Sequence, residues 1–228
     1  MLVRAIGDTH GRDDWKKVPF KDCDKFIFIG DYFDSFNISV EFQLANFLDI
    51  LMLKRRYPNK VTLLIGNHDH HYTPRTTQTY SGFNHNPAIR IHMEDALRKG
   101  LLTMAEEIDG VIYTHAGLSN KWMTNSDVSS IEEINELYHT KPTMFDFQYG
   151  DRDSNVYPSP YGDNIFQGPL WIRPYSLGLD ANPATQIVGH TAHEEITNKD
   201  NIWFIDVLET KKQYVDVQDS VVTVRDFQ

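Results

Sequence analysis

Aspartate, asparagine and histidine residues follow five apolar segments of the chain, each time directly after a short run rich in Val, Ile, Leu and Phe. Such a run ending at a polar turn is typical of a buried strand that delivers its last side chains to one edge of a sheet. The five turns are Gly7-Asp8-Thr9-His10-Gly11, Gly30-Asp31-Tyr32-Phe33-Asp34, Gly66-Asn67-His68-Asp69, His115-Ala116-Gly117 and Gly189-His190-Thr191. We therefore expect one set of ligand-type side chains at one edge, which indicates a metal site.

The residue types in these turns suit divalent transition metals. Asp8 and His10 are two residues apart in an extended turn, so both can face one ion. Asp31 follows a central strand, and its carboxylate is the natural bridge between two ions. Mixed oxygen and nitrogen ligation favours Mn, Fe or Zn over Ca or a soft-metal cluster. Two such ions about 3.5–4 Å apart would activate a water and hold phosphoryl oxygens. The remaining oxygen and imidazole ligands come from Asn67, His115 and His190.

The elements that must position these turns can be predicted from the apolar pattern. Strands are predicted at 2–6, 26–29, 61–65, 111–114 and 186–188. Ser39 can cap a helix over about 40–57, and the order strand, helix, strand predicts a βαβ unit with parallel pairing. Further helices are predicted over about 88–99 and over 131–138. The sequence therefore predicts an α/β fold.

The C-terminal half has a different pattern. Residues of about 140–180 are rich in Pro, Gly, Tyr and Asp with no sustained period, which predicts a loop-rich insertion over the active site. Three later strands, at 202–206, 213–217 and 220–224, have hairpin-like spacing and predict antiparallel pairing on a second sheet. We expect residues 1–228 to form a single domain.

Composition excludes several classes of protein. A net charge of −10 argues against a general nucleic-acid binder. Cys23 is the only cysteine, which excludes an internal disulfide framework and a Cys-based zinc site. The longest apolar run is far below the roughly 20 residues that a membrane span needs. Because residues 2–6 already read as a strand, we expect no signal peptide and a cytoplasmic location.

Taken in order, the five turns resemble the motifs of the calcineurin-like metallophosphoesterases, and within that superfamily the serine/threonine phosphoprotein phosphatases and their bacterial and phage relatives. One Gly-Asp-x-His is a weak signal, whereas five motifs in register over residues 7–191 are specific. The resemblance implies a four-layer α/β/β/α sandwich with two mixed sheets. It also implies two divalent metal ions, with Mn expected and Fe or Zn as alternatives.

The resemblance implies a reaction and a role for each matching residue. A metal-bridging hydroxide would attack a phosphomonoester of a protein or a small molecule, with no covalent phospho-enzyme. His68 would protonate the leaving oxygen, and Asp34 would hold His68. The implied metal ligands are Asp8 and His10 on the first ion, Asp31 as the bridge, and Asn67, His115 and His190 on the second ion.

The chain departs from this family pattern at three positions. Ser35 and Asp69 stand where the protein phosphatases usually have Arg and Glu, and Ala116 stands where many have Gly. The missing arginine is the one that clamps the substrate phosphate in the family. Arg173 resembles a second family arginine near the phosphate, and Arg152 and Arg75 are other loop candidates. We expect Arg173 first, and then Arg152, to bind the substrate.

Two other functions are compatible with the motifs. A nucleotide hydrolase would cleave symmetric dinucleoside tetraphosphates or cyclic nucleotides at the same centre. A metal-binding scaffold without catalysis is disfavoured, because the chain retains His68 and every implied ligand. His193 is left out of the ligand set, since it follows His190 by three residues rather than two. The histidines interpreted as structural are His70, His71, His85, His92 and His139.

Overall fold

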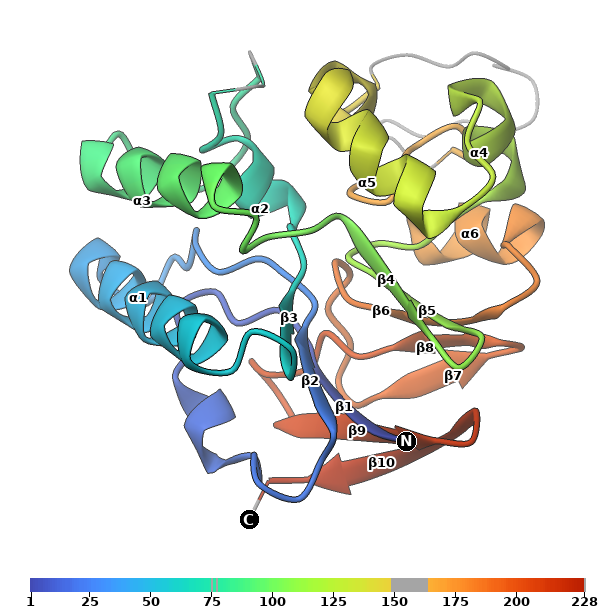
Figure 1. The fold of residues 1–228 in the computed structure, drawn as a ribbon, viewed down its shortest axis with the longest axis horizontal. Coiled ribbons are helices and arrows are strands. Elements are labelled where there is room, and N and C mark those ends of the chain that lie inside the picture. The colour runs from blue at the N-terminus through green and yellow to red at the C-terminus, as the bar shows by residue number, and fades with distance from the viewer. Residues whose placement is uncertain (75, 77, 149–163, 228) are drawn as a thin grey trace.

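The computed structural model describes residues 1–74, 76, 78–148 and 164–227, and its strands form two sheets (Figure 1). The first sheet has the order β10-β9-β1-β2-β3. Its strands are β1 (Leu2–Ile6), β2 (Lys25–Phe28), β3 (Val61–Leu63), β9 (Gln213–Gln218) and β10 (Val221–Asp226). β1, β2 and β3 run parallel to one another, whereas β9 is antiparallel to both β1 and β10.

The second sheet has the order β4-β5-β6-β8-β7. Its strands are β4 (Ala105–Ile108), β5 (Val111–Thr114), β6 (Thr185–Val188), β7 (Thr197–Lys199) and β8 (Ile202–Phe204). β5, β6 and β8 are parallel, and the two edge strands β4 and β7 are antiparallel to their neighbours. Both sheets are therefore mixed, and the parallel strands in each carry the predicted motifs at their carboxyl ends.

Helices cover the outer sides of the two sheets (Figure 1). α1 (Val40–Arg56) and α3 (Pro87–Arg98) lie on the side of the first sheet, with the short α2 (Asn67–His70) above β3. On the side of the second sheet lie α4 (Asn120–Ser126), α5 (Ile131–Thr140) and α6 (Pro174–Asp180). The short 3₁₀ helices are η1 (Asp14–Lys17) and η2 (Pro142–Phe145). The predicted four-layer sandwich is confirmed.

Alternate residues of the strands pack on opposite faces of the sheets, as the pleat requires. Ala5 and Ile27 belong to the core between the sheets, whereas Ile6, Phe26 and Phe28 pack on the helix side of the first sheet. Both faces of these strands are covered, which explains why their sequences read as continuous apolar runs rather than as alternating ones. The core between the sheets contains Ile29, Leu64, Val111, Tyr113, Ile187, Ile205 and Val215.

Capping residues next to the helices in the sequence predicted the longer helices correctly. Ser39 caps α1, because its Oγ accepts a hydrogen bond from the backbone N–H of Phe42 at 3.3 Å. α3 begins with Pro87 after the Asn86 cap, and Gly100 follows it with φ of +63°, the left-handed conformation that commonly ends helices. The predicted helix over 131–138 is α5, which extends to Thr140.

One sequence prediction about the C-terminal half is wrong. β9 and β10 do form an antiparallel hairpin, but they extend the first sheet beside β1 instead of the second sheet. In the predicted loop-rich range 140–180, the described residues include the two short helices η2 and α6. That this range is an insertion over the active site stays a prediction. Residues 149–163 of that predicted insertion, including Arg152, lie outside the described residues, and so does Arg75.

Across the described ranges, no helix is both long enough and apolar enough to cross a membrane. The cytoplasmic location stays a prediction.

Candidate metal centre

The ligand-type residues of both sheets meet where the parallel strands end. Of the six, Asp8, Asp31, Asn67 and His115 are buried. The first sheet contributes Asp8 and His10 after β1, Asp31 after β2 and Asn67 after β3, and the second sheet contributes His115 after β5 and His190 after β6. The structure thus brings together residues that lie far apart in the chain.

Asn67 and Asp31 are the points on which the histidine rings converge. Oδ1 of Asn67 lies 2.8 Å from Nε2 of His115 and 2.9 Å from Nδ1 of His190. Oδ2 of Asp31 lies 3.4 Å from Nε2 of His115 and 3.6 Å from Nε2 of His10. Asp31 therefore stands between the His10 half and the His115 half of the cluster.

The position of the proton on His115 indicates whether this cluster can bind a cation. Its Nδ1 lies 3.1 Å from the carbonyl oxygen of Ile29, so Nδ1 carries the proton and donates it. Burial lowers the pKa of His115 well below the ordinary value, which keeps the ring neutral. Its Nε2 then has a lone pair, and this lone pair faces the oxygens of Asp31 and Asn67.

His10 repeats this arrangement on the other side of Asp31. Its Nδ1 donates to the carbonyl oxygen of Phe33 at 2.5 Å, and burial lowers the pKa of the ring to about 4. Nε2 of His10 therefore also turns a lone pair toward Asp31 Oδ2. Two unprotonated nitrogens around one carboxylate oxygen have no proton to share, and a divalent cation satisfies all three acceptors. The donor set fits metal ions.

The buried carboxylates point to the same conclusion. Burial raises the pKa of Asp31 well above its usual range, and the charge of Asp8 raises it further. Burial likewise raises the pKa of Asp8, and the next contribution comes from Asp206. Bound cations would offset this accumulation of negative charge, as is usual where carboxylates are buried together.

Two motif glycines allow the ligand turns to approach one another. A Cβ atom on Gly66 would lie 2.1 Å from Oδ1 of Asp31, and one on Gly189 would lie 2.0 Å from Oδ1 of Asp8. Only glycine fits at either place. The absence of these side chains lets the backbone N–H of His190 donate to Asp8 Oδ2 at 3.0 Å.

Asp206 is a buried acid of the site that the sequence analysis missed. It follows β8, whose carboxyl end lies beside that of β6, and it is 9% exposed. Burial raises the pKa of Asp206 to about 6, opposed by the positive charges of Arg12 and Arg173. The sequence did contain an indication of this role, because Asp206 ends an apolar run as the residues of the other motifs do. The predicted strand at 202–206 included Asp206 as a strand residue, whereas β8 ends at Phe204.

Asp69 holds two of the ligand turns together. Its Oδ2 accepts hydrogen bonds from the backbone N–H groups of Asp31 at 2.7 Å and Gly66 at 2.8 Å, and its Oδ1 accepts one from Tyr32 at 2.8 Å. Burial raises the pKa of Asp69 to about 7, against the effect of these hydrogen bonds. Although shorter than the family glutamate, Asp69 joins the turn after β2 to the turn before α2.

Asp69→Asn is expected to lower the free energy of unfolding by about 2–4 kcal/mol. The amide has one acceptor oxygen, and its NH₂ group would face backbone N–H donors, so at least one buried donor loses its partner. Urea denaturation of the metal-free protein measures the effect. Asp200→Asn, at an exposed turn, is the matched control. An unchanged midpoint for Asp69→Asn would show that Asp69 does not hold the turns.

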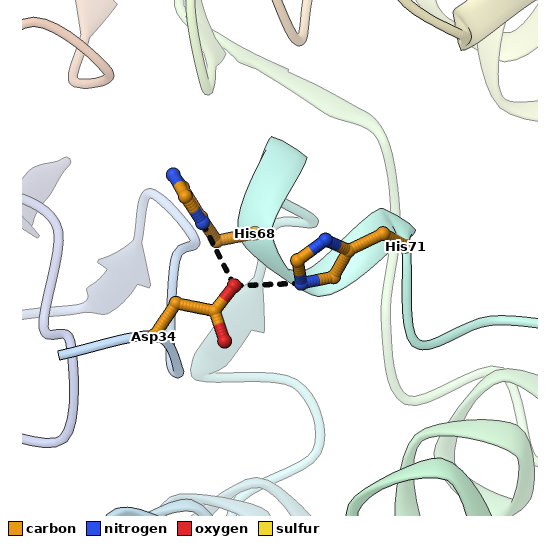
Figure 2. Close-up of side chains that lie close together, drawn as sticks. All are labelled: Asp34, His68 and His71. Carbon is orange, nitrogen blue, oxygen red and sulfur yellow. Dashed lines mark hydrogen bonds and ion pairs between the residues drawn. The ribbon is translucent and has the colours of Figure 1, made fainter. Parts of the chain in front are cut away.

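His68 and Asp34 form the predicted pair (Figure 2). Nδ1 of His68 lies 2.8 Å from Oδ2 of Asp34, and the backbone N–H of His68 donates to Asp31 Oδ1 at 2.9 Å. Burial raises the pKa of Asp34, but hydrogen bonds from His68, His71 and Tyr72 outweigh it and hold the pKa below its usual value. Asp34 is therefore an ionised acceptor that orients the His68 ring.

His71 is a member of this group that was interpreted as an ordinary structural histidine. Its Nε2 lies 2.6 Å from the same Asp34 oxygen that His68 contacts (Figure 2). The backbone N–H of Tyr80 donates to Nδ1 of His71 at 3.1 Å, so the proton of His71 is on Nε2, facing Asp34. The spacing of three residues between His68 and His71 is the signal that was available, because it puts both rings on one side of a helical turn.

Arg173 lies beside His190, one of the expected metal ligands. Its guanidinium donates to Oγ1 of Thr191 at 3.1 Å and to the carbonyl oxygen of His190 at 3.4 Å. Its positive charge contributes, after burial, to lowering the pKa of His190. At the position of the family arginine, the backbone N–H of Ser35 donates to the Gln43 side chain, which fixes the loop without supplying a charge.

Comparison with known proteins agrees with this geometry. The family model described as calcineurin-like phosphoesterase matches residues 1–194. The chain belongs to the calcineurin-like phosphoesterases. A serine/threonine-protein phosphatase 4 catalytic subunit from Eremothecium gossypii is 31% identical over 163 residues, covering 66% of this chain and 49% of the relative. A putative serine/threonine-protein phosphatase from Schizosaccharomyces pombe is 28% identical over 191 residues, covering 76% of this chain and 58% of the relative.

Among solved structures, a protein serine/threonine phosphatase from Saccharomyces cerevisiae with similarity to human phosphatase PP5 matches all of this chain and 80% of its own, with a TM-score of 0.59 and 14% identity. This likeness supports the fold. Both curated relatives are named serine/threonine-protein phosphatases, which agrees with the predicted branch of the superfamily. The chain spans about half the length of the curated relatives that it matches.

Proposed function

We propose that this calcineurin-like phosphoesterase hydrolyses phosphomonoesters, in the manner of a serine/threonine phosphatase, at a centre of two divalent metal ions. The convergence of unprotonated ring nitrogens on Asp31 is the observation that carries the proposal. The family match and the phosphatase relatives support the reaction class. Mn is the expected metal, with Fe or Zn as alternatives.

Six residues would hold the ions. The ions, when bound, supply positive charge to the phosphoryl oxygens and activate the attacking water. Asp8 and His10 would serve one ion, Asp31 both, and Asn67, His115 and His190 the other.

Residues of the chain would protonate the leaving group and bind the negatively charged phosphoryl oxygens. Because Nδ1 of His68 donates to Asp34, its Nε2 is the atom that can deliver a proton to the leaving oxygen. Asp34 stabilises the protonated ring and fixes its direction. Arg173, whose guanidinium lies near His190, can donate to a phosphoryl oxygen.

A substrate panel tests the proposal. The protein loaded with Mn is assayed on phosphoserine and phosphothreonine peptides, nucleoside monophosphates, dinucleoside tetraphosphates and cyclic nucleotides. Turnover that is fastest on the phosphomonoesters supports the proposal. Turnover confined to dinucleoside tetraphosphates or cyclic nucleotides would favour the nucleotide hydrolase instead. Full metal loading without turnover of any substrate would indicate a binding scaffold.

Arg173→Ala is expected to cost about 2–4 kcal/mol of transition-state stabilisation, because a charge-assisted contact to the phosphoryl group is lost. Steady-state kinetics on a phosphopeptide measure this as a fall in kcat/KM. Metal content should stay at the wild-type value, since Arg173 is not a ligand. Unchanged kcat/KM would assign the substrate contact to another cation.

A further inference from the structure

A small pocket lies beside His68, and neither His190 nor Arg173 is among the described residues that line it. Its volume is about 170 Å³. The residues that line it include His10, Arg12, Asp34, Ser35 and His68. Because His10 and His68 both line it, the pocket adjoins the candidate centre. Among the described residues that line it, Arg12 is the only arginine or lysine.

Arg12 is held in this pocket from two directions. Its Nη2 lies 2.9 Å from Oε1 of Glu209, and its Nη1 donates to the carbonyl oxygen of Thr9 at 3.4 Å. The Arg12 side chain is only 14% exposed, whereas that of Glu209 is 62% exposed. Arg12 is thus a nearly buried cation whose counter-ion sits at the solvent edge and can be displaced.

Arg12 lies next to the centre, because it lines the same pocket as His10 and His68. Burial raises the pKa of Asp206, and the positive charges of Arg12 and Arg173 both oppose this rise. Arg12 belongs to the turn after β1, whereas Arg173 precedes α6.

With Ser35 at the position of the family arginine, a positive charge in this pocket has to come from another loop. The loop after Asp34 contributes only short or neutral side chains to it, Ser35 and Asn37 among them. Arg12 directly follows Gly11, whose φ of +78° turns the chain at this point, and it enters the same pocket from the neighbouring loop.

We propose that Arg12 is the substrate-binding arginine on the His68 side of the centre, where it binds the dianionic phosphoryl group opposite Arg173. This rests on the proposed function. Glu209 holds the guanidinium while the pocket is free of substrate and competes with the incoming phosphate for it. A planar guanidinium can exchange a carboxylate for a phosphate, to which it can donate two parallel hydrogen bonds.

Binding of inorganic phosphate to the Mn-loaded protein tests the proposal without any leaving group. Titration calorimetry gives the affinity, and competitive inhibition of phosphopeptide turnover gives Ki. Arg12→Ala is expected to weaken phosphate binding by about 10-fold or more, and Arg12→Lys by less, since the charge remains. Glu209→Gln is expected to tighten binding about two- to threefold, because the competing carboxylate is removed.

The double variant Arg12→Ala/Glu209→Gln separates this role from a general charge effect. In the absence of Arg12, Glu209→Gln should no longer tighten phosphate binding, since the two effects act through one ion pair. Arg98→Ala, on an exposed side chain of α3, and Glu195→Gln, near the exposed Lys211, are the charge-matched controls. Metal content and the unfolding midpoint are measured for every variant.

Equal phosphate affinity in the wild type and Arg12→Ala, with metals intact, overturns the proposal. Loss of metal or of folding in both Arg12→Ala and Arg12→Lys also overturns it, because Arg12 is then structural. Failure of the proposed function looks different: no substrate of the panel turns over, while the calorimetric comparison of the wild type with Arg12→Ala still decides whether Arg12 binds phosphate.

Discussion

Asp31→Asn is expected to lose metal from both positions and to abolish turnover. Oδ2 of Asp31 faces His10 Nε2 at 3.6 Å and His115 Nε2 at 3.4 Å, so one oxygen serves both halves of the site. Asparagine has the same size, but it has a single oxygen and no charge, and its NH₂ group cannot act as a ligand. By comparison, Asp8→Asn should mainly weaken the ion held with His10.

Elemental analysis of the purified variants after dialysis against Mn measures the effect. Asp219→Asn is the matched control. Asp31 and Asp219 both have a positive φ, 53° and 51°, but Asp219 lies at an exposed turn between β9 and β10. Thermal unfolding of the metal-free proteins shows that the fold is kept. The Asp31→Asn midpoint should equal or exceed that of the wild type, since the substitution removes a buried charge beside Asp8. Two fully loaded metals in Asp31→Asn would contradict the bridging role.

His68→Asn is expected to lower kcat by roughly 10²- to 10⁴-fold on alkyl phosphates while both metals stay bound. Nδ1 of His68 is committed to Asp34, which leaves Nε2 for the leaving oxygen. An alkoxide leaves poorly without a proton, whereas p-nitrophenolate is stable as an anion. The loss should therefore be large on a phosphoserine peptide and small on p-nitrophenyl phosphate.

The comparison of the two substrates is the decisive measurement for His68. Exposed His139 on α5 provides the control substitution, His139→Asn. Equal losses on both substrates with intact metals would refute the role as an acid. Loss of metal would instead identify His68 as a ligand.

The sequence predicted those parts of the molecule that depend on local signals. The strands before the motifs, the cap at Ser39 and the four-layer architecture all follow from apolar runs and turn residues that lie next to one another in the chain. The edge strands β4 and β7 were missed, because Ala105–Ile108 and Thr197–Lys199 are too short and too polar to show a period. The fully exposed pattern of β7 is possible only because a neighbouring strand pairs with it.

Other features depend on contacts between distant residues. Nothing within β9 distinguishes one sheet from the other; its place follows from pairing between Leu2 and Gln218 at opposite ends of the chain. The role of His71 likewise appears only when the turn after β2 brings Asp34 to it. Arg12 gave no signal beyond its position next to a motif, and its pocket is formed together with Glu209, which is remote in sequence.

The division of ligands between the sheets has a mechanical consequence. Asp8, His10 and Asp31 all belong to the first sheet, whereas Asn67 faces His115 and His190 across the gap between the two sheets. An ion at the second position would therefore link the two sheets. The distance between the sheets is set by the packing of core side chains such as Ile187 and Val215, and this distance determines the spacing of the ligands at that position. Substitutions in the core between the sheets can thus change the ligand spacing at one metal position without changing it at the other.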